Sequence, residues 1–245
     1  MKITSKNHPY AKKWKQMIAG ERQEKGVFWS DHFRIIQYAL DHGLVKELIF
    51  PENSGSWDKL GRPDGFFINE EVRSFIGLHH NHMALIQRPC LSIENYDRIL
   101  LIDSIRETGP LGTMIRTARS FGFDGVILTG TSIDPFDRYA SRAAQANLFA
   151  LPVLSLPFPE AVSLLKREGC TLVTPGFFNA GTIEDLPLDN KIAVMISAAG
   201  GTSPAILSAA DLFCRMDFNC ADPVLVSLTA SILMHACRNL KGEPL

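Results

Sequence analysis

The sequence predicts an α/β protein in two parts, the larger of which is built on a parallel sheet. From Ile99 onward, apolar strand patterns alternate with amphipathic helix patterns, as in a parallel sheet covered by helices. The polar stretch 92–97 separates this region from a smaller α/β region before it. The length of 245 residues is sufficient for two modest domains. We therefore expect domains at residues 1–91 and 97–245.

In the smaller part, apolar residues recur at helical spacing or form short runs rich in aromatic and β-branched residues. These patterns predict a helix over 8–23, a strand at 27–29, a helix over 33–42, a strand at 45–50, a strand followed by a helix within 66–75, and a strand at 83–86. The stretch 51–63 is rich in Pro, Gly, Ser, Asn and Asp. That composition is typical of a loop.

In the larger part, the strand patterns are continuous apolar runs, which are typical of strands buried on both faces. The predicted strands are 99–103, 125–129, 152–154, 170–174 and 192–196. The predicted helices are 112–121, 139–146, 159–168, 203–209 and 224–240.

Ligand sites in open parallel sheets lie beyond the C-terminal ends of the strands. Three of the loops expected there are rich in glycine: Gly109 with Gly112, then Gly130, and Gly200 with Gly201. Glycine in such a loop either lets a ligand approach the backbone or serves the geometry of a turn. The sequence leaves both interpretations open.

The composition is that of a soluble globular protein, with 46% hydrophobic and 21% charged residues. No stretch approaches the roughly 18 unbroken apolar residues of a membrane span, and the N-terminus has no apolar signal region. The five cysteines are scattered and form no C-x-x-C pair, which favours buried free thiols in a reducing compartment. We therefore expect a cytoplasmic protein that has no contact with a membrane.

The net charge of −1 creates no overall attraction to nucleic acid, but the opening segment is basic. Such a segment either supplies phosphate contacts or is a solvated helix face. If it binds RNA, the candidate residues are Lys6, Lys12 and Lys13, together with Arg34 on the next predicted helix.

Two segments of the larger part resemble the signatures of the SpoU (TrmH-like) RNA ribose methyltransferases of the SPOUT superfamily. That family has a strand ending in Asp, followed by D-P-x-N-x-G-x-x-x-R-T-A and a turn like G-F-D. The segment 103–124, DSIRETGPLGTMIRTARSFGFD, resembles this first signature. The segment 193–202, AVMISAAGGT, lies where the second signature, G-N-E-G-x-G, follows an apolar strand. Residues 216–238 resemble the closing segment.

The opening ITSKNHP and the following residues, to about position 90, resemble the substrate-binding domain that is often fused in front of this methyltransferase domain. That domain has a fold like a small ribosomal protein. The resemblance therefore covers nearly the whole chain and implies an RNA substrate-binding domain followed by a SpoU-type domain with an α/β trefoil knot.

The resemblance implies transfer of a methyl group from S-adenosylmethionine to a ribose 2′-hydroxyl of tRNA or rRNA by a homodimer. The cofactor carries the reactive group, and the protein aligns it with the hydroxyl. The resemblance gives the catalytic role to Arg116. The residues that it places around the cofactor are Thr129, Gly130, Ser197, Gly200, Gly201, Met216 and Leu225.

The chain departs from the family pattern at several polar positions. Pro110 replaces the Asn of the first motif, and Ser197, Ala198 and Ala199 replace the Gly, Asn and Glu of the second. The third motif aligns either with 222–224 or with 227–229. Each lost side-chain hydrogen bond is worth roughly 0.5–1.5 kcal/mol, but backbone groups are retained. A catalytically impaired homologue that acts as a non-enzymatic RNA-binding or dimerisation protein is therefore the alternative.

Two further alternatives concern individual features. Arg116 is either functional or a surface arginine paired with an acid such as Glu107. The histidines of the segment 79–82, HHNH, alternate in direction if the segment is a strand, and no cysteine or aspartate cluster has zinc spacing. We therefore expect no metal site.

Overall fold

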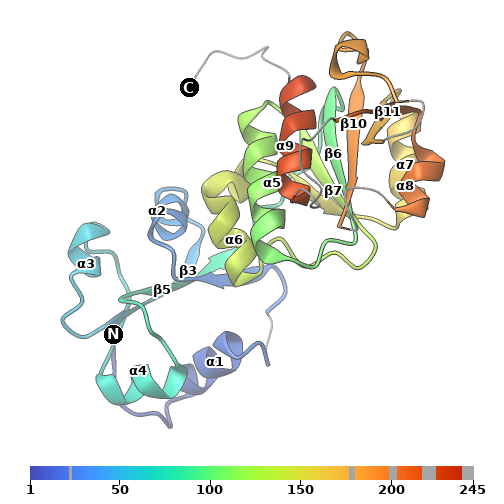
Figure 1. Ribbon diagram of the computed structural model, residues 1–245. Helices are drawn as coiled ribbons and strands as arrows, with labels where there is room; N and C mark the ends of the chain where they lie inside the picture. Colours follow the sequence, from blue (N-terminus) through green and yellow to red (C-terminus); the bar gives the residue numbers. More distant parts are fainter. Residues whose placement is uncertain (22–23, 177–179, 199–202, 217–224, 239–245) are drawn as a thin grey trace. The chain divides into compact units, whose positions relative to one another are not determined.

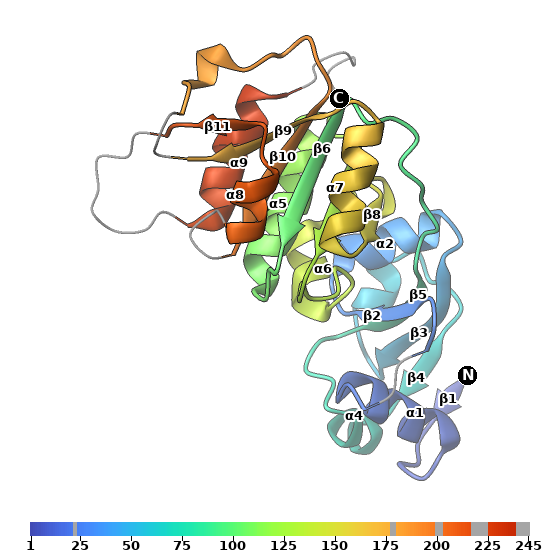
Figure 2. The ribbon, with the colours of Figure 1, turned by 90° about the vertical axis from the view of Figure 1, so that its right-hand side faces the viewer.

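The computed structural model of the chain describes residues 1–21, 24–176, 180–198, 203–216 and 225–238. The chain divides into two units, Met1–Pro89 and Cys90–Leu245. Each unit is a sheet with helices packed on it (Figures 1 and 2). In the described ranges no helix has both the length and the apolar character needed to cross a membrane.

The first unit has a five-stranded mixed sheet in the order β1-β4-β3-β5-β2. Its strands are β1 (Lys2–Ile3), β2 (Val27–Ser30), β3 (Val45–Pro51), β4 (Phe66–Ile68) and β5 (Met83–Gln87). Strands β1, β4 and β3 are parallel, and β5 is antiparallel to both of its neighbours. Its helices are α1 (Pro9–Ile18), α2 (Phe33–Asp41), α3 (Ser56–Lys59) and α4 (Glu70–Ile76).

Helices α1 and α4 pack side by side on one face of this sheet, over a core that includes the fully buried Trp14. Local signals set their ends. Proline at the first position of α1 already has helical φ. The Asn69 side chain caps α4 by accepting a hydrogen bond from the Val72 amide, and Gly77 ends it in the left-handed conformation.

The second unit has a six-stranded parallel sheet in the order β11-β9-β10-β6-β7-β8. Its strands are β6 (Arg98–Asp103), β7 (Gly125–Thr129), β8 (Val153–Ser155), β9 (Thr171–Pro175), β10 (Ile192–Ser197) and β11 (Leu212–Cys214). Its helices are α5 (Thr108–Ser120), α6 (Arg138–Ala144), α7 (Phe158–Arg167), α8 (Pro204–Ala209) and α9 (Val226–Ala236), with short 3₁₀ turns η1 (Gln145–Phe149) and η2 (Ile183–Asp185).

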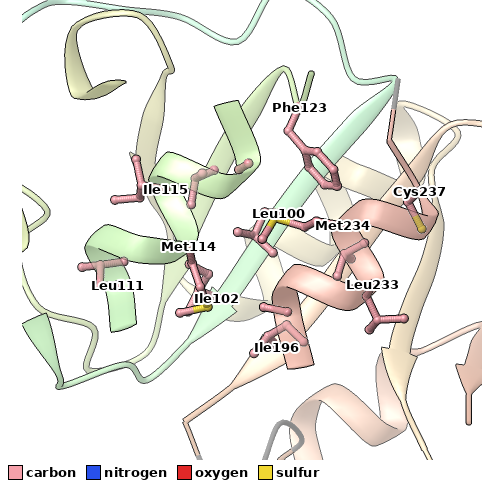
Figure 3. Packing of buried hydrophobic residues seen from close by; sticks show 14 of the residues in the cluster. Leu100, Ile102, Leu111, Met114, Ile115, Phe123, Ile196, Leu233, Met234 and Cys237 are labelled. Carbon is pink, nitrogen blue, oxygen red and sulfur yellow. The ribbon is translucent and has the colours of Figure 1, made fainter. Parts of the chain in front are cut away.

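Strand β6 lies within this sheet, and all six of its residues are buried. Successive side chains of a strand point to opposite faces. Leu100 and Ile102 therefore pack with α5, α6 and α9 (Figure 3), whereas Ile99 and Leu101 pack with α7 and α8. Full burial of each such side chain contributes about 1.5–3 kcal/mol, so the two faces of β6 hold the layers together.

The start of β6 fixes the direction of the last helix. The buried Arg98 guanidinium donates to the backbone carbonyls of Cys237 (2.6 Å), Asn190 (2.7 Å), Leu188 (2.5 Å) and Asp97 (2.7 Å). Cys237 is the C-terminal cap of α9. Helix α9 therefore runs antiparallel to β6, and its N-terminal end lies at the edge where the strands end.

Gly112, which the sequence analysis grouped with the loop glycines, has a packing role in the structure. The glycine lies inside α5, where an added Cβ would overlap the Ala140 carbonyl and the Ala143 methyl group of α6. Gly112 therefore lets two helices approach closely, and it lies within a helix and not in a loop beyond a strand end. Gly109, one turn earlier in α5, has no atom within 4 Å of an added Cβ.

Candidate active site

The two middle connections of the parallel sheet leave it on opposite faces. Strand β6 leads to α5, which packs on the face covered by α9, whereas the neighbouring β10 leads to α8 on the other face. Such a switch point opens a crevice beyond the C-terminal strand ends, where ligands of α/β proteins bind. The register places Ser197, Asp103 and Thr129 in one row across β10, β6 and β7 at this edge.

The Asp103 carboxylate is the centre of a hydrogen-bond cluster at this edge. Oδ1 accepts from Thr129 Oγ1 at 2.8 Å and from Ser104 Oγ at 3.3 Å. Oδ2 accepts from Ser203 Oγ at 3.3 Å. Ser203 caps α8 through the Ile206 amide. One buried side chain thus joins the end of β7 to the start of α8.

The loops after β6 and β7 approach each other closely at Ser104 and Gly130. Both have left-handed backbone, with φ of +56° and +61°, a conformation that is costly for a residue other than glycine. A Cβ at Gly130 would overlap the Ser104 hydroxyl. The Ser104 amide donates to the Thr129 carbonyl at 3.1 Å. Glycine is therefore required at position 130, where the exposed backbone is directly beside the polar cluster.

The predicted cofactor residues occupy this same edge where the structure describes them. Thr129 and Ser197 are each 2% exposed. Met216 follows β11 and is buried in the core under α9. Leu225 precedes α9 and is 71% exposed. The remaining two predicted residues, Gly200 and Gly201, lie outside the described residues.

Arg116 lies on the exposed surface of α5. Its carbonyl accepts a hydrogen bond from Ser120 Oγ at 3.0 Å. Within the described ranges, its guanidinium forms no ion pair, so the pairing with Glu107 that would make it a structural residue is not seen there. Its charge is therefore accessible to a ligand.

Asp103, Ser104 and Ser203 are polar residues of this edge that the sequence interpretation did not select. The signal for Asp103 was its position at the end of a buried apolar strand, and the signal for Ser203 was a serine before a proline at a helix start. Their contact joins residues 100 positions apart. Local patterns carry no information on such a pairing.

The four predicted RNA-contacting residues of the first unit differ in their surroundings. Lys12 and Arg34 are exposed, and Lys6 is exposed with its ammonium 3.7 Å from Glu71. Lys13 is only 18% exposed and pairs with Glu24 at 3.0 Å and Glu47 at 2.6 Å. Burial lowers the Lys13 pKa, but the bonds to both carboxylates outweigh this and raise it. Its charge is thus already neutralised within the unit.

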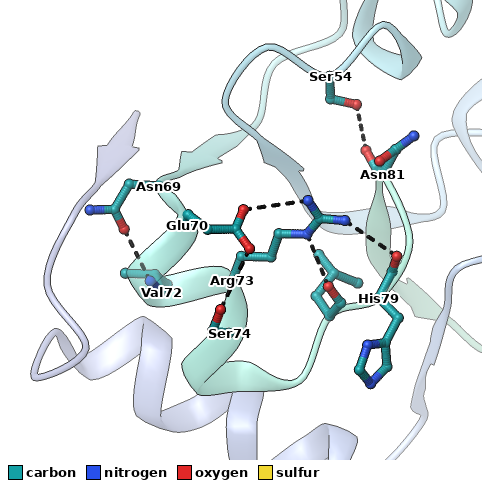
Figure 4. Close-up of polar contacts among 9 residues, drawn as sticks. Ser54, Asn69, Glu70, Val72, Arg73, Ser74, His79 and Asn81 are labelled. Atoms are coloured by element: carbon teal, nitrogen blue, oxygen red, sulfur yellow. Dashed lines mark hydrogen bonds and ion pairs between the residues drawn. The ribbon is translucent and has the colours of Figure 1, made fainter.

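The histidine-rich segment is part of the internal polar network of the first unit. Arg73 donates to the carbonyls of Leu78 (3.1 Å) and His79 (3.3 Å), and pairs with Glu70 (Figure 4). His82 Nδ1 lies 3.0 Å from Ser56 Oγ, and burial lowers the His82 pKa. Among the described residues, no group of three or more His, Cys, Asp or Glu side chains is arranged to hold a metal ion.

A family comparison decides how this edge of the sheet is to be interpreted. The family model described as "SpoU rRNA Methylase family" matches residues 97–235, more than half of the chain. The chain belongs to the SpoU rRNA methylase family. This match contains the Asp103 cluster, Arg116 and every predicted cofactor residue, and it confirms the family resemblance on which the candidate residues rested.

Curated SpoU relatives act on ribosomal RNA according to their names. The chain is 27% identical over 244 residues to the 23S rRNA (guanosine(2553)-2′-O)-methyltransferase RlmP of Bacillus subtilis (strain 168), covering 96% of this chain and 98% of that protein. It is 24% identical over 213 residues to the 23S rRNA (uridine(2479)-2′-O)-methyltransferase of Streptomyces viridochromogenes, covering 77% of this chain and 73% of that protein.

Solved SpoU structures share the fold over almost the whole chain. The AdoMet-bound rRNA methyltransferase from Sinorhizobium meliloti matches with a TM-score of 0.80 at 20% identity, covering 97% of both chains. The SpoU methyltransferase AviRb from Streptomyces viridochromogenes matches with a TM-score of 0.78 at 19% identity, covering 94% of this chain and 96% of that one. The predicted α/β methyltransferase fold is confirmed. The residues 217–224, which connect β11 to α9, lie outside the described ranges.

Proposed function

We propose that this chain transfers a methyl group from S-adenosylmethionine to a ribose 2′-hydroxyl of ribosomal RNA. The observation that carries the proposal is the SpoU family match over 97–235, which contains the whole candidate edge of the sheet. The similarity to RlmP along 96% of this chain supports ribosomal RNA as the substrate class. The name of the S. meliloti neighbour, which is bound to AdoMet, supports the cofactor.

The residues at the edge of the sheet fit such a cofactor. Gly130 is exposed there, so its backbone groups are accessible to a polar ligand, and Met216 supplies an apolar contact. When bound, S-adenosylmethionine supplies a methyl group that its sulfonium has already activated. The protein holds the binding loops in place. Asp103 does this through Thr129 and Ser203, so the loops need little ordering when the ligand arrives.

Arg116 is the residue that we propose to act on the RNA. A guanidinium is always charged and presents several N–H donors in a plane. It can therefore orient the ribose hydroxyl or clamp a neighbouring phosphate, and it is not suited to accept a proton. Its exposed position on α5 and the absence of a pairing carboxylate in the described ranges leave it accessible for that contact.

Methyl transfer to ribosomal RNA by the Arg116→Ala variant tests this role. Loss of a positioning contact should lower the transfer rate about a hundred-fold, with an unchanged melting temperature because the side chain is exposed. Arg119→Ala is the matched control, since Arg119 is also exposed on α5. A large fall in melting temperature for Arg116→Ala would instead make the residue structural. Cofactor binding without transfer by the wild type would favour the non-enzymatic alternative.

We also propose, from the same family membership, that the protein is a cytoplasmic homodimer that contacts RNA through its first unit. Leu225, just before α9, and Leu228 on α9 are 71% and 51% exposed and support self-association through this helix. Leu233, also on α9, is fully buried in the core of its own unit. A monomer in light scattering at high concentration would contradict the dimer. For RNA contacts, the accessible candidates are Lys6, Lys12 and Arg34.

A further inference from the structure

The first unit contains a cavity of about 660 Å³ at one end of its sheet. Strand β3 starts at Val45, but β4 pairs with it only from Ile49 onward. On that side, the first residues of β3 therefore border the cavity instead of a neighbouring strand. A cavity of this size is in the range of small-ligand sites.

Aromatic rings form the walls of the cavity. Tyr10, Trp57, Phe66 and Phe67 all line it, and each is partly exposed. Trp57 is held by a hydrogen bond from Nε1 to the Pro63 carbonyl at 3.0 Å and by an edge contact with Phe67 at 5.5 Å between ring centroids. Tyr10 contacts Phe66 at 4.8 Å. The rings are therefore ordered before any ligand binds.

The charges around the cavity favour an anion. Met1, Lys46 and Arg62 line it. The Met1 ammonium donates to the Gly65 carbonyl at 2.8 Å, and the Arg62 guanidinium pairs with Asp58 at 2.8 Å. Glu47 also lines it, but its two oxygens accept from Lys13 Nζ and Trp14 Nε1, each at 2.6 Å.

The other lining carboxylate belongs to Asp64, which is exposed. Lys46 is exposed too, and no carboxylate of the described ranges pairs with it. Two lining cations, the Met1 ammonium and Lys46, thus face the Asp64 carboxylate, and none of these three groups forms an ion pair within the described part of the chain.

We propose that this cavity binds an unpaired nucleotide of the RNA substrate; the proposal rests on the proposed function. Sites for single-stranded nucleic acid combine aromatic rings, which stack on bases, with cations along the backbone. Here the base stacks against Trp57 or Tyr10, and its phosphates meet Lys46 and Arg62. Asp64 accepts hydrogen bonds from amino groups on the edge of the base. In unpaired RNA a base is free to leave its neighbours and stack on an aromatic side chain of the cavity.

The test uses the full chain with a single-stranded RNA oligonucleotide that carries photoreactive iodouridine. Cross-links should map to Trp57, Tyr10 or Phe67. Lys46→Glu and Trp57→Ala should each weaken RNA binding about ten-fold. Lys46 is exposed, so its variant tests the site even if Trp57→Ala fails to fold. Lys59→Glu is the matched control, because Lys59 is exposed on α3 and does not line the cavity.

Three results would overturn the proposal. The first is that Lys46→Glu binds RNA as tightly as the wild type and that the cross-links map to residues outside the cavity. The second is binding of free adenosine monophosphate in the cavity as tightly as RNA, which would indicate a small-molecule site. The third is a wild type that binds no RNA, which would also remove the proposed function. Titration of each variant with S-adenosylmethionine separates these cases, because a failure confined to the cavity leaves cofactor binding intact.

Discussion

Strand β6 carries a buried charge at each end, and the two ends are used differently. Arg98 at the start donates to backbone carbonyls of four residues, which fixes α9 and the segment before β10. Asp103 at the end accepts from three side-chain hydroxyls, on Thr129, Ser104 and Ser203. At the edge where β6 starts, the Arg98 side chain therefore occupies the backbone carbonyls. At the edge where β6 ends, side chains bond to side chains and leave exposed backbone accessible.

The difference indicates which positions at the edge where β6 ends tolerate substitution. The Asp103 carboxylate holds Ser104, Thr129 and Ser203 together at the base of this edge, so the exposed positions above it need few polar side chains of their own. By the family resemblance, Pro110 and Ala198 lie where the motifs have hydrogen-bonding side chains. The backbone at Gly130 remains exposed beside that cluster. We infer that binding at this edge depends more on loop position than on polar side chains at those positions.

The largest expected effect is at the edge where β6 starts. Arg98→Met leaves the carbonyls of Cys237, Asn190 and Leu188 without their donor. It should lower the free energy of unfolding by about 3 kcal/mol or more, because each buried acceptor left unsatisfied costs about 1–3 kcal/mol. Denaturant unfolding measures this. Arg167→Met, at an exposed arginine of α7, is the control. A loss below about 1 kcal/mol would show that the guanidinium bonds do not hold α9.

The next effect compares two glycines of α5, one in a close helix contact and one in open space. Gly112→Ala forces a methyl group into the Ala140 carbonyl of α6 and should cost about 3 kcal/mol, as overpacking does. Gly109→Ala, one turn away with open space around it, should be neutral or stabilise the helix slightly. Equal melting temperatures for the two variants would refute the close contact between α5 and α6.

Asp103→Asn should affect binding more than stability. The amide cannot accept at both of its positions, so about 1–3 kcal/mol of stability is lost. The affinity for S-adenosylmethionine should fall further, because two binding loops lose their common anchor. Ser203→Ala removes one arm of the cluster and should give an intermediate affinity. If Asp103→Asn is destabilised but binds S-adenosylmethionine as tightly as the wild type, the cluster has a structural role only.

The smallest effect concerns the thiols. Burial raises the pKa of Cys237 to about 12 and those of Cys170 and Cys214 to about 11. These folded-state values exceed the ordinary value of 9.0, so their stabilising contribution is complete below pH 9. It is lost as the pH rises through about 11 for Cys170 and Cys214 and about 12 for Cys237. At neutral pH an alkylating agent, followed by mass spectrometry, should modify the exposed Cys90 and leave these three thiols intact. Rapid modification of Cys170 in folded protein would contradict their burial.

Periodicity predicted most strands and helices, since apolar runs such as 99–103 are long and buried on both faces. It missed β11 at Leu212–Cys214, a three-residue strand whose first residue is 37% exposed, because so short a run has no recognisable period. The family motif placed Thr129, Ser197 and Met216 at one edge of the sheet. The bond between Asp103 and Ser203 and the pairing of Lys13 with Glu47 depend on distant residues, so no local pattern predicted them.

The central claim is that the edge formed by β10, β6 and β7 binds S-adenosylmethionine through accessible backbone, with few polar side chains of its own. Calorimetric titration of the wild type, beside Gly130→Val, tests it most directly. The account predicts one cofactor per chain at micromolar concentration for the wild type, and a large loss for Gly130→Val, whose side chain would overlap Ser104. No heat from the folded wild type at millimolar cofactor would contradict it.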